Sequence, residues 1–210
     1  MDCKKETILI TGGTGFIGSH VCYIFLKQGF NVISLDSLVN SSKKVNKNIY
    51  NLLLSEGYEV TDNLKFIKGD IRNKDLLRLV FNEQIKVKKP ITSVIHLAGL
   101  KSVKQSKLNP IDYWSNNVCG SINLFNVMKE FKCNSIVFSS SATIYGISEN
   151  TLIKENEPVK PQNPYGKTKA TIEKILEDIF EESYKSMRIS NLRYFNPIGA
   201  HETALIGELP

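Results

Sequence analysis

The sequence predicts an α/β fold: a doubly wound parallel sheet of the Rossmann type with helices on both faces. Short apolar runs alternate with stretches of helical spacing, and the runs are mostly hydrophobic without a strict polar alternation. Strands of a parallel sheet carry such runs because helices cover both of their faces. The 210 residues are enough for one sizeable core, and we expect residues 1–210 to form one such domain.

Six runs predict the strands, in chain order: Thr7–Thr11, Asn31–Leu35, Leu64–Lys68, Ser93–Leu97, Ser135–Ser139 and Ile189–Phe195. Each run is short and rich in apolar residues that favour strands. Five stretches repeat apolar residues at helical spacing: Phe16–Gln28, Val45–Glu56, Asp75–Glu83, Asp112–Phe131 and Tyr165–Tyr184. The last stretch follows the polar, proline-containing loop ENEPVKPQN. Ligands of such sheets bind beyond the carboxyl ends of the strands, so the residues directly after each run are the site candidates.

Composition excludes several classes of function. The formal charge of +6 comes almost entirely from scattered lysines, so we expect no nucleic-acid partner. Cys3, Cys22, Cys119 and Cys133 show neither metal-ligand nor C-x-x-C spacing, and three of them lie in apolar-rich stretches. We therefore expect reduced, buried thiols, no disulfide framework and no metal. The first strand pattern begins within a few residues of Met1 and no run reaches membrane-span length, so the expected compartment is the cytoplasm, with no membrane partner.

The segment ILITGGTGFIGSH predicts a dinucleotide-binding turn. Gly12, Gly15 and Gly18 follow a strand and open a helix, where glycines allow a tight turn and a close backbone approach to a pyrophosphate. Asp36 follows the second strand, where a carboxylate accepts hydrogen bonds from an adenosine ribose. No arginine follows in DSLVNSS to meet a 2′-phosphate, which favours NAD over NADP. Asp70, after the third strand, either caps the following helix or faces the adenine.

The heptapeptide NPYGKTK predicts catalysis. On a helix, Lys169 lies one turn after Tyr165 on the same face. A tyrosine that acts as a base near neutral pH needs its pKa of about 10 lowered by roughly three units. A lysine ammonium and a positive nicotinamide ring would both lower it. The segment SSSATIYG after the fifth strand supplies the hydroxyls of Ser139–Ser141 and Thr143, which can hydrogen-bond the reacting oxygen.

The chain resembles the extended short-chain dehydrogenase/reductase family, and within it the UDP-glucose 4-epimerases. The segments that carry the resemblance stand in family order and cover almost the whole chain: TGGTGFIGSH, LDSLVNSS, GDIRN, HLAGLKSV, NNVCGSINL, FSSSATIYG, NPYGKTK and LRYFNPIGAH. Several are shared with sugar-nucleotide dehydratases and decarboxylases, whereas AGLKSV, SSSATIYG and RYFNPIGAH together resemble the 4-epimerases most. The departures are small: Phe16 stands for the usual tyrosine and Leu97 for a frequent phenylalanine.

The resemblance implies the functional residues one motif at a time. It implies that NAD is contacted by Gly12, Gly15, Phe16, Ile17, Gly18, Asp36, Asn40, Asp70, Ile71, Leu97, Ala98, Gly99, Lys101, Asn116, Lys169 and Phe195. It implies that Tyr165 is the catalytic base, assisted by Lys169, with Ser141 and Thr143 as its partners on the sugar hydroxyl. Contacts to the UDP-sugar are implied for Lys101, Ser141, Tyr165 and Asn196.

The activity implied is the isomerase reaction of galactose metabolism that interconverts UDP-glucose and UDP-galactose. Tyr165 would remove the proton of the 4-hydroxyl while C4 gives a hydride to tightly held NAD. The 4-keto sugar would turn over in the site and receive the hydride on its opposite face. The resemblance also implies a homodimer that packs through Asp112–Phe131 and Tyr165–Tyr184.

Two other functions are compatible with parts of the sequence. A 4,6-dehydratase would need an acid/base pair of Asp and Glu after the fifth strand, where SSSATIYG supplies only hydroxyls. A catalytically silent NAD-binding module is the other, because family members continue beyond the position of Pro210 into a domain that closes over the UDP-sugar. On that resemblance we expect a C-terminally truncated chain in which NAD binding survives better than epimerase activity.

Overall fold

The fold is seen in a computed structural model that describes residues 6–59, 63–147, 152–183 and 185–208. The strands are β1 (Thr7–Thr11), β2 (Asn31–Asp36), β3 (Leu64–Lys68), β4 (Ile91–His96), β5 (Ser135–Ser141) and β6 (Arg188–Tyr194). They form one sheet in the order β3-β2-β1-β4-β5-β6, and every neighbouring pair is parallel. The strand order reverses between β1 and β4, so the predicted doubly wound fold is confirmed.

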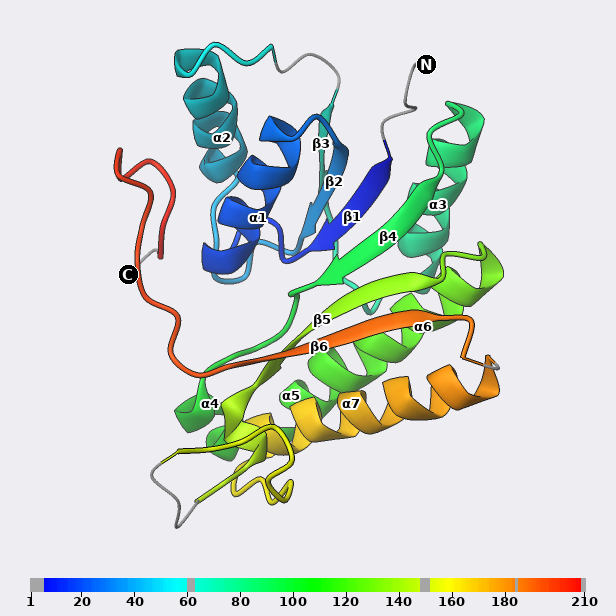
Figure 1. The fold of residues 1–210 in the computed structure, drawn as a ribbon, viewed down its shortest axis with the longest axis vertical. Helices are drawn as coiled ribbons and strands as arrows, with labels where there is room; N and C mark the ends of the chain where they lie inside the picture. Colours follow the sequence, from blue (N-terminus) through cyan, green and yellow to red (C-terminus); the bar gives the residue numbers. More distant parts are fainter. Residues whose placement is uncertain (1–5, 60–62, 148–151, 184, 209–210) are drawn as a thin grey trace.

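Helices cover both faces of this sheet. The helical elements are α1 (Phe16–Lys27), α2 (Lys44–Ser55), α3 (Lys74–Lys86), α4 (Val103–Leu108), α5 (Pro110–Tyr113), the π-helix η1 (Trp114–Cys119), α6 (Gly120–Glu130), the 3-10 turn η2 (Ala142–Ile144) and α7 (Pro164–Glu182). The helices α1 and α2 lie on one face, and α3, α6 and α7 lie on the other (Figure 1). Each predicted helix is present, although α5, η1 and α6 together form the one predicted over Asp112–Phe131, α4 was not predicted, and Tyr184 lies outside the described residues.

The two faces of β1 show why its sequence is uniformly apolar. Ile8 and Ile10 pack into the cluster formed with α1 and α2. Leu9, between them, points to the opposite face and packs into the cluster formed with α3, α6 and α7. All five residues of β1 are buried, as a central strand between two helical layers requires.

The chain after β6 returns to α1 and α2 and forms part of that layer (Figure 1, red). Ile206 is only 2% exposed and joins their apolar cluster. The His201 ring meets the Tyr23 ring edge-on at 5.1 Å between centroids, and the Asn48 side-chain amide donates to the Leu205 carbonyl over 2.7 Å. These contacts hold the following residues beside the carboxyl edge of the sheet.

The cysteine prediction is partly wrong. Cys22 and Cys133 are buried free thiols, but Cys119 is exposed because it lies on the solvent side of η1. Cys3 lies outside the described residues. Within the described ranges, every helix is too short or too polar to span a membrane.

His96 connects three elements at the carboxyl edge of the sheet. It ends β4 and is 1% exposed. Its Nδ1 lies 2.7 Å from the Thr11 hydroxyl of β1, and its Nε2 lies 2.8 Å from the Ser121 hydroxyl of α6. Burial lowers the pKa of His96 from 6.5 to about 3, and the nearby charge of Lys169 adds to this shift.

The lowered pKa predicts a loss of stability in acid. The unfolded chain binds a proton at this imidazole near pH 6.5, whereas the folded chain binds it only near pH 3, so folding stability falls as the pH falls through this window. The titration of this one imidazole changes the free energy of unfolding by at most about 5 kcal/mol. Urea unfolding of the wild type at pH 7, 6, 5 and 4 measures it. The free energy of unfolding of the variant His96→Asn should depend less steeply on pH than that of the wild type. Equal slopes for the wild type and His96→Asn would contradict the assignment.

Candidate functional site

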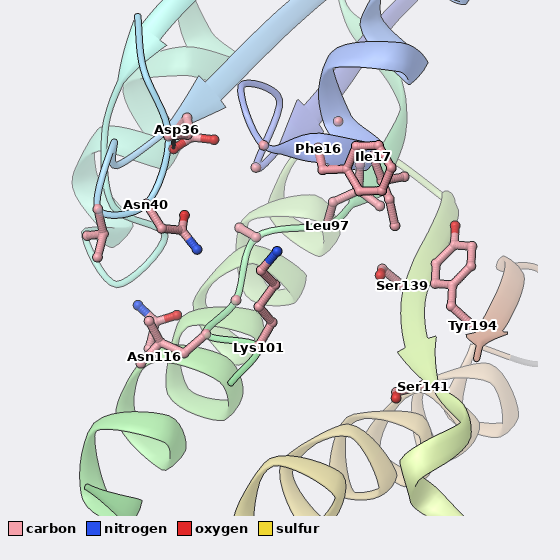
Figure 2. A pocket seen from close by; sticks show the side chains of 18 of the residues that line it. Phe16, Ile17, Asp36, Asn40, Leu97, Lys101, Asn116, Ser139, Ser141 and Tyr194 are labelled. Atoms are coloured by element: carbon pink, nitrogen blue, oxygen red, sulfur yellow. Dashed lines mark hydrogen bonds between the residues drawn. The ribbon is translucent and has the colours of Figure 1, made fainter. Parts of the chain in front are cut away.

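A cavity of about 440 Å³ runs along the carboxyl ends of all six strands. Every residue for which a site role is predicted lines it: Gly12, Gly15, Phe16, Ile17, Gly18, Asp36, Asn40, Asp70, Ile71, Leu97, Ala98, Gly99, Lys101, Asn116, Ser141, Thr143, Tyr165, Lys169, Phe195 and Asn196. Figure 2 shows Asp36 at one end of the cavity, Ser141 at the other and Lys101 between them. The volume is that of a pocket for a small ligand or cofactor.

The glycine-rich turn brings backbone close to backbone at the centre of the cavity. Gly12 has a φ of +73°, and a Cβ added there would lie 2.8 Å from the Ala98 nitrogen. A Cβ on Gly18 would lie 2.1 Å from the Gly12 carbonyl oxygen. Gly15, at the N-cap of α1, has no side chain to occupy the free N–H groups of the first turn. The turn is therefore packed without space for side chains, and it presents a helix N-terminus that favours an anion.

Asp36 is a fixed carboxylate at the end of β2. It is 6% exposed, and its Oδ2 accepts a hydrogen bond from the Thr14 backbone N–H at 3.1 Å. Its Oδ1 accepts from the Leu38 N–H at 2.8 Å and from the Ser41 hydroxyl at 3.0 Å. Sequence reasoning missed Thr14 and Ser41, since a threonine and a serine in loops give no signal of a shared acceptor. The carboxylate retains acceptor capacity toward the cavity that it lines.

Asp70 does not cap the helix that follows it, so that alternative is wrong. Asn73 is the N-cap of α3, and its side chain accepts from the Leu76 N–H at 2.9 Å. Asp70 instead binds Arg72 through a 2.6 Å ion pair and lines the cavity. The Arg72 side chain lowers the pKa of this carboxyl by hydrogen bonding to its charged form.

The start of α7 sets Tyr165 and Lys169 on one face. Asn163 caps the helix by accepting from the Gly166 N–H at 2.9 Å, and Pro164 occupies the first turn. The helix therefore begins immediately before Tyr165. The Lys169 Nζ lies 5.8 Å from the centroid of the Tyr165 ring, as the spacing predicts.

Lys169 is a buried cation with specific partners. It is 4% exposed, its Nζ donates to the Ser139 carbonyl at 2.6 Å, and it lies 4.8 Å from the centroid of the Phe138 ring. Burial lowers the pKa of Lys169 to about 8, while the negative charge of Glu173 opposes that shift. The ammonium is thus charged at neutral pH but close to its titration range.

The protein surroundings of Tyr165 favour its neutral form. Burial raises the pKa of its phenol above the ordinary value of 10, and a hydrogen bond with Ser141 only partly opposes this shift. The nearby Tyr113 also contributes in the raising direction. The protein groups around Tyr165 therefore keep the phenol neutral, because burial outweighs the polar contacts.

Ser141 and Thr143 form a chain of hydroxyls that ends at Tyr165. Ser141 is the last residue of β5 and is 6% exposed. The η2 turn brings Thr143 back, so that its hydroxyl donates to the Ser141 Oγ at 3.0 Å and its N–H donates to the same atom at 3.2 Å. The interaction with Ser141 also acts to lower the pKa of the Tyr165 phenol.

Asn117 is a structural residue of the site that sequence reasoning missed. It is 1% exposed in η1, its Oδ1 accepts from the Leu100 N–H at 2.8 Å, and its Nδ2 donates to the Leu100 carbonyl at 3.1 Å. The same Nδ2 donates to the Thr168 hydroxyl at 3.1 Å. The amide thereby fastens the loop that carries Gly99 and Lys101 to α7. An asparagine within an apolar helical stretch was the only sequence signal of this role, and its partners Leu100 and Thr168 lie far from it in the sequence.

Tyr194 and Glu208 also line the cavity without having been predicted. Tyr194 ends β6 directly before Phe195, so its place at the edge of the sheet was a usable signal. Glu208 forms an ion pair with Lys101, which depends on the return of the chain after β6. In the part of the chain that the structure describes, no group of three or more His, Cys, Asp or Glu side chains could hold a metal ion.

This fold, with a cavity at the carboxyl edge of the sheet, is that of the short-chain dehydrogenase/reductase class. The family model described as GDP-mannose 4,6 dehydratase matches residues 9–208, and the chain belongs to that family. Among curated relatives, a UDP-glucose 4-epimerase of Cyamopsis tetragonoloba is 45% identical over 205 residues, covering 98% of this chain and 55% of the relative. A UDP-glucose 4-epimerase of Neisseria gonorrhoeae is 45% identical over 206 residues, covering 97% of this chain and 57% of the relative. The chain thus spans about half the length of these relatives.

Solved structures show the same similarity. The UDP-glucose 4-epimerase of Stenotrophomonas maltophila, with bound NAD and formylated UDP-arabinopyranose, matches with a TM-score of 0.87 and 38% identity, over 98% of this chain and 57% of that one. The UDP-glucose 4-epimerase of Bifidobacterium longum, in complex with NAD+ and UDP, matches with a TM-score of 0.84 and 39% identity, over 96% of this chain and 57% of that one.

The glycine turn predicts a difference between two substitutions. Gly12 and Gly57 both have positive φ, at +73° and +82°, but a Cβ on Gly57 would meet no atom within 4 Å. Gly57→Ala should therefore cost only the left-handed backbone penalty, about 1 kcal/mol. Gly12→Ala should cost about 2 kcal/mol more, because it also forces the turn away from Ala98. Urea unfolding of both variants tests this, and equal losses would show that the turn is not tightly packed.

Proposed function

We propose that this chain binds NAD and catalyses epimerisation at C4 of a UDP-sugar, as a UDP-glucose/UDP-galactose 4-epimerase of galactose metabolism. The observation that carries the proposal is the convergence of Ser141, Tyr165 and Lys169 at one end of a cavity whose other end holds Asp36. The relatives and solved structures named above, all called UDP-glucose 4-epimerases, support it. Under this proposal residues 1–210 are the NAD-binding domain and also carry the catalytic residues.

The residues of the cavity fit NAD. The N–H groups at the start of α1 and the bare backbone of Gly12 and Gly15 suit a pyrophosphate, which binds where no side chain intervenes. Asp36 offers carboxylate acceptors for the hydroxyls of an adenosine ribose, and its charge disfavours the 2′-phosphate of NADP. The solved structures from Stenotrophomonas maltophila and Bifidobacterium longum hold NAD. Phe16, Ile17, Asn40, Asp70, Ile71, Leu97, Ala98, Gly99, Lys101, Asn116 and Phe195 complete the proposed contact set.

The protein groups in this proposal move one proton. The Tyr165 phenolate removes the proton of the C4 hydroxyl and returns it after the sugar has turned. Ser141 and Thr143 hold the reacting oxygen, because their hydroxyls already form a hydrogen-bonded chain to Tyr165. Lys169 supplies a fixed positive charge that stabilises the phenolate. NAD, when bound, supplies the hydride acceptor and donor, and its positive ring provides the remaining stabilisation of the phenolate.

The proposal favours epimerisation over dehydration. The description of the matching family model names a 4,6 dehydratase. A dehydratase needs an acid/base pair after β5, where this chain has Ala142 and Thr143. Lys101 and Asn196, which line the same cavity, are the proposed further contacts to the UDP-sugar. The two solved structures with bound UDP or a bound UDP-sugar support this choice of substrate class.

We also propose a homodimer and a cytoplasmic location. The surface formed by α5, η1, α6 and α7 is proposed as the dimer interface, supported by the exposed side chains of Ile111 and Trp114. Apolar side chains exposed on neighbouring helices are typical of such interfaces. The free thiols of Cys22, Cys119 and Cys133 support a reducing compartment.

One experiment tests both the binding and the chemistry. Calorimetry measures the binding of NAD to the purified full chain. A coupled dehydrogenase assay measures its turnover of UDP-galactose to UDP-glucose. We expect Tyr165→Phe to retain NAD binding and to lose turnover by a factor of about 10² or more, because the proton acceptor is removed. The control Tyr50→Phe, on the exposed side of α2, should change neither quantity.

The outcomes separate the alternatives. Turnover by Tyr165→Phe at the wild-type rate would contradict the catalytic role of the phenol. NAD binding by the wild type without any turnover of UDP-sugars would support the silent NAD-binding module instead. If the wild-type chain does not bind NAD, the whole proposal is overturned.

A further inference from the structure

A cluster of charged and polar side chains lies behind the proposed catalytic residues, on the side of β5 and β6 that faces α7. Glu173 of α7 is its centre, with a side chain that is 10% exposed. Arg193 of β6 donates to both of its oxygens, with Nε distances of 3.1 and 3.2 Å and an Nη2 distance of 2.7 Å. The Ser140 hydroxyl of β5 donates to the same carboxylate. One carboxylate therefore joins α7 to the ends of the two strands that carry Ser141 and Tyr194.

Arg193 extends the cluster to the loop after η2. Its Nη1 donates to the Tyr145 hydroxyl and to the Glu155 carbonyl, each at 2.8 Å, and its guanidinium lies 5.2 Å from the centroid of the Tyr145 ring. The side chain is 25% exposed, so this ion pair is screened far less than a surface pair. Removing one partner of such a pair leaves the other charge uncompensated.

Glu173 also lies one helical turn after Lys169 on the same face of α7. Its negative charge raises the pKa of the Lys169 ammonium and so opposes the effect of burial, which lowers that pKa. Among the residues that the structure describes, Tyr165 on α7 and His96 on β4 also lie near Lys169, and neither supplies a negative charge at neutral pH. Glu173 is thus the anion that compensates Lys169.

We propose that Glu173, held by Arg193 and Ser140, is a positioning residue of the site. It fixes the ends of β5 and β6 against α7 and keeps the Lys169 side chain in its charged form. Its role in catalysis rests on the proposed function, since only then does the charge on Lys169 serve the Tyr165 phenolate. Its role toward Lys169 is a property of the protein chain and is measurable without cofactor or substrate.

Substitutions of Glu173 and of Arg193 should shift the pKa of Lys169 in opposite directions. Arg193 draws the charge of Glu173 away from Lys169, because it binds both carboxylate oxygens. Glu173→Gln removes the anion, so the pKa of Lys169 should fall below its value of about 8. Arg193→Gln releases the anion toward Lys169, so the same pKa should rise. A purely structural role would shift both variants in one direction.

The measurement is an NMR titration of the full chain labelled with 13C- and 15N-lysine, between pH 6 and pH 11. The Lys169 signal is assigned by its loss in Lys169→Met, and circular dichroism confirms that each variant is folded. The matched control is Glu177→Gln, one turn further along α7, where an exposed carboxylate pairs with Lys174 at 2.9 Å. This control should leave the Lys169 pKa unchanged. Glu173→Asp, which keeps the charge, should lower it less than Glu173→Gln does.

Opposite shifts in Glu173→Gln and Arg193→Gln support the proposal. Shifts in the same direction, or no shift in either variant, overturn it. If Glu173→Gln fails to fold, Arg193→Gln decides alone: a rise supports the proposal, and a fall or an unchanged value contradicts it. Absence of epimerase turnover in the wild type would affect the proposed function and would leave these titrations unaltered.

Discussion

The burial of one ammonium group, that of Lys169, is the constraint on which the arrangement of the site depends. Removing a cation from water costs several kcal/mol unless polar partners replace the solvent. Here the Ser139 carbonyl, the face of Phe138 and the charge of Glu173 replace it. Those partners come from β5 and α7, so satisfying one charge also fixes the strand end beside the helix that carries Tyr165.

The topology of the sheet brings the rest of the site to the same place. All six strands are parallel and their order reverses between β1 and β4, so six carboxyl ends open onto one cavity. Close contacts then set the distances between the loops of the site. The Gly12 backbone lies against Ala98, and the Asn117 side chain fastens the loop at Leu100 to α7. The site is therefore built from rigid strand ends, with its loops held by buried hydrogen bonds.

Much of this was predictable because each signal was local or followed from strand direction. The bounds of β1 and β3 agree with the prediction, and every predicted site residue lines the cavity, since residues that follow parallel strands converge. What failed depended on tertiary contacts. Asp70 pairs with Arg72, so Asn73 caps α3 in its place. Likewise, the pairing of Glu173 with Arg193 needed β6 to lie beside α7.

In the proposed reaction the protein keeps Tyr165 neutral, and a positive charge delivered with the cofactor makes it a base. The most direct measurement is the pKa of Tyr165, followed through the 13Cζ signal of labelled tyrosine in the full chain, alone and with saturating NAD or NADH. We expect a Tyr165 pKa above 10 in the chain alone, a clear fall with NAD, and a smaller fall with NADH, whose nicotinamide ring is uncharged. A pKa below 10 in the chain alone, or the same value with and without NAD, would contradict it.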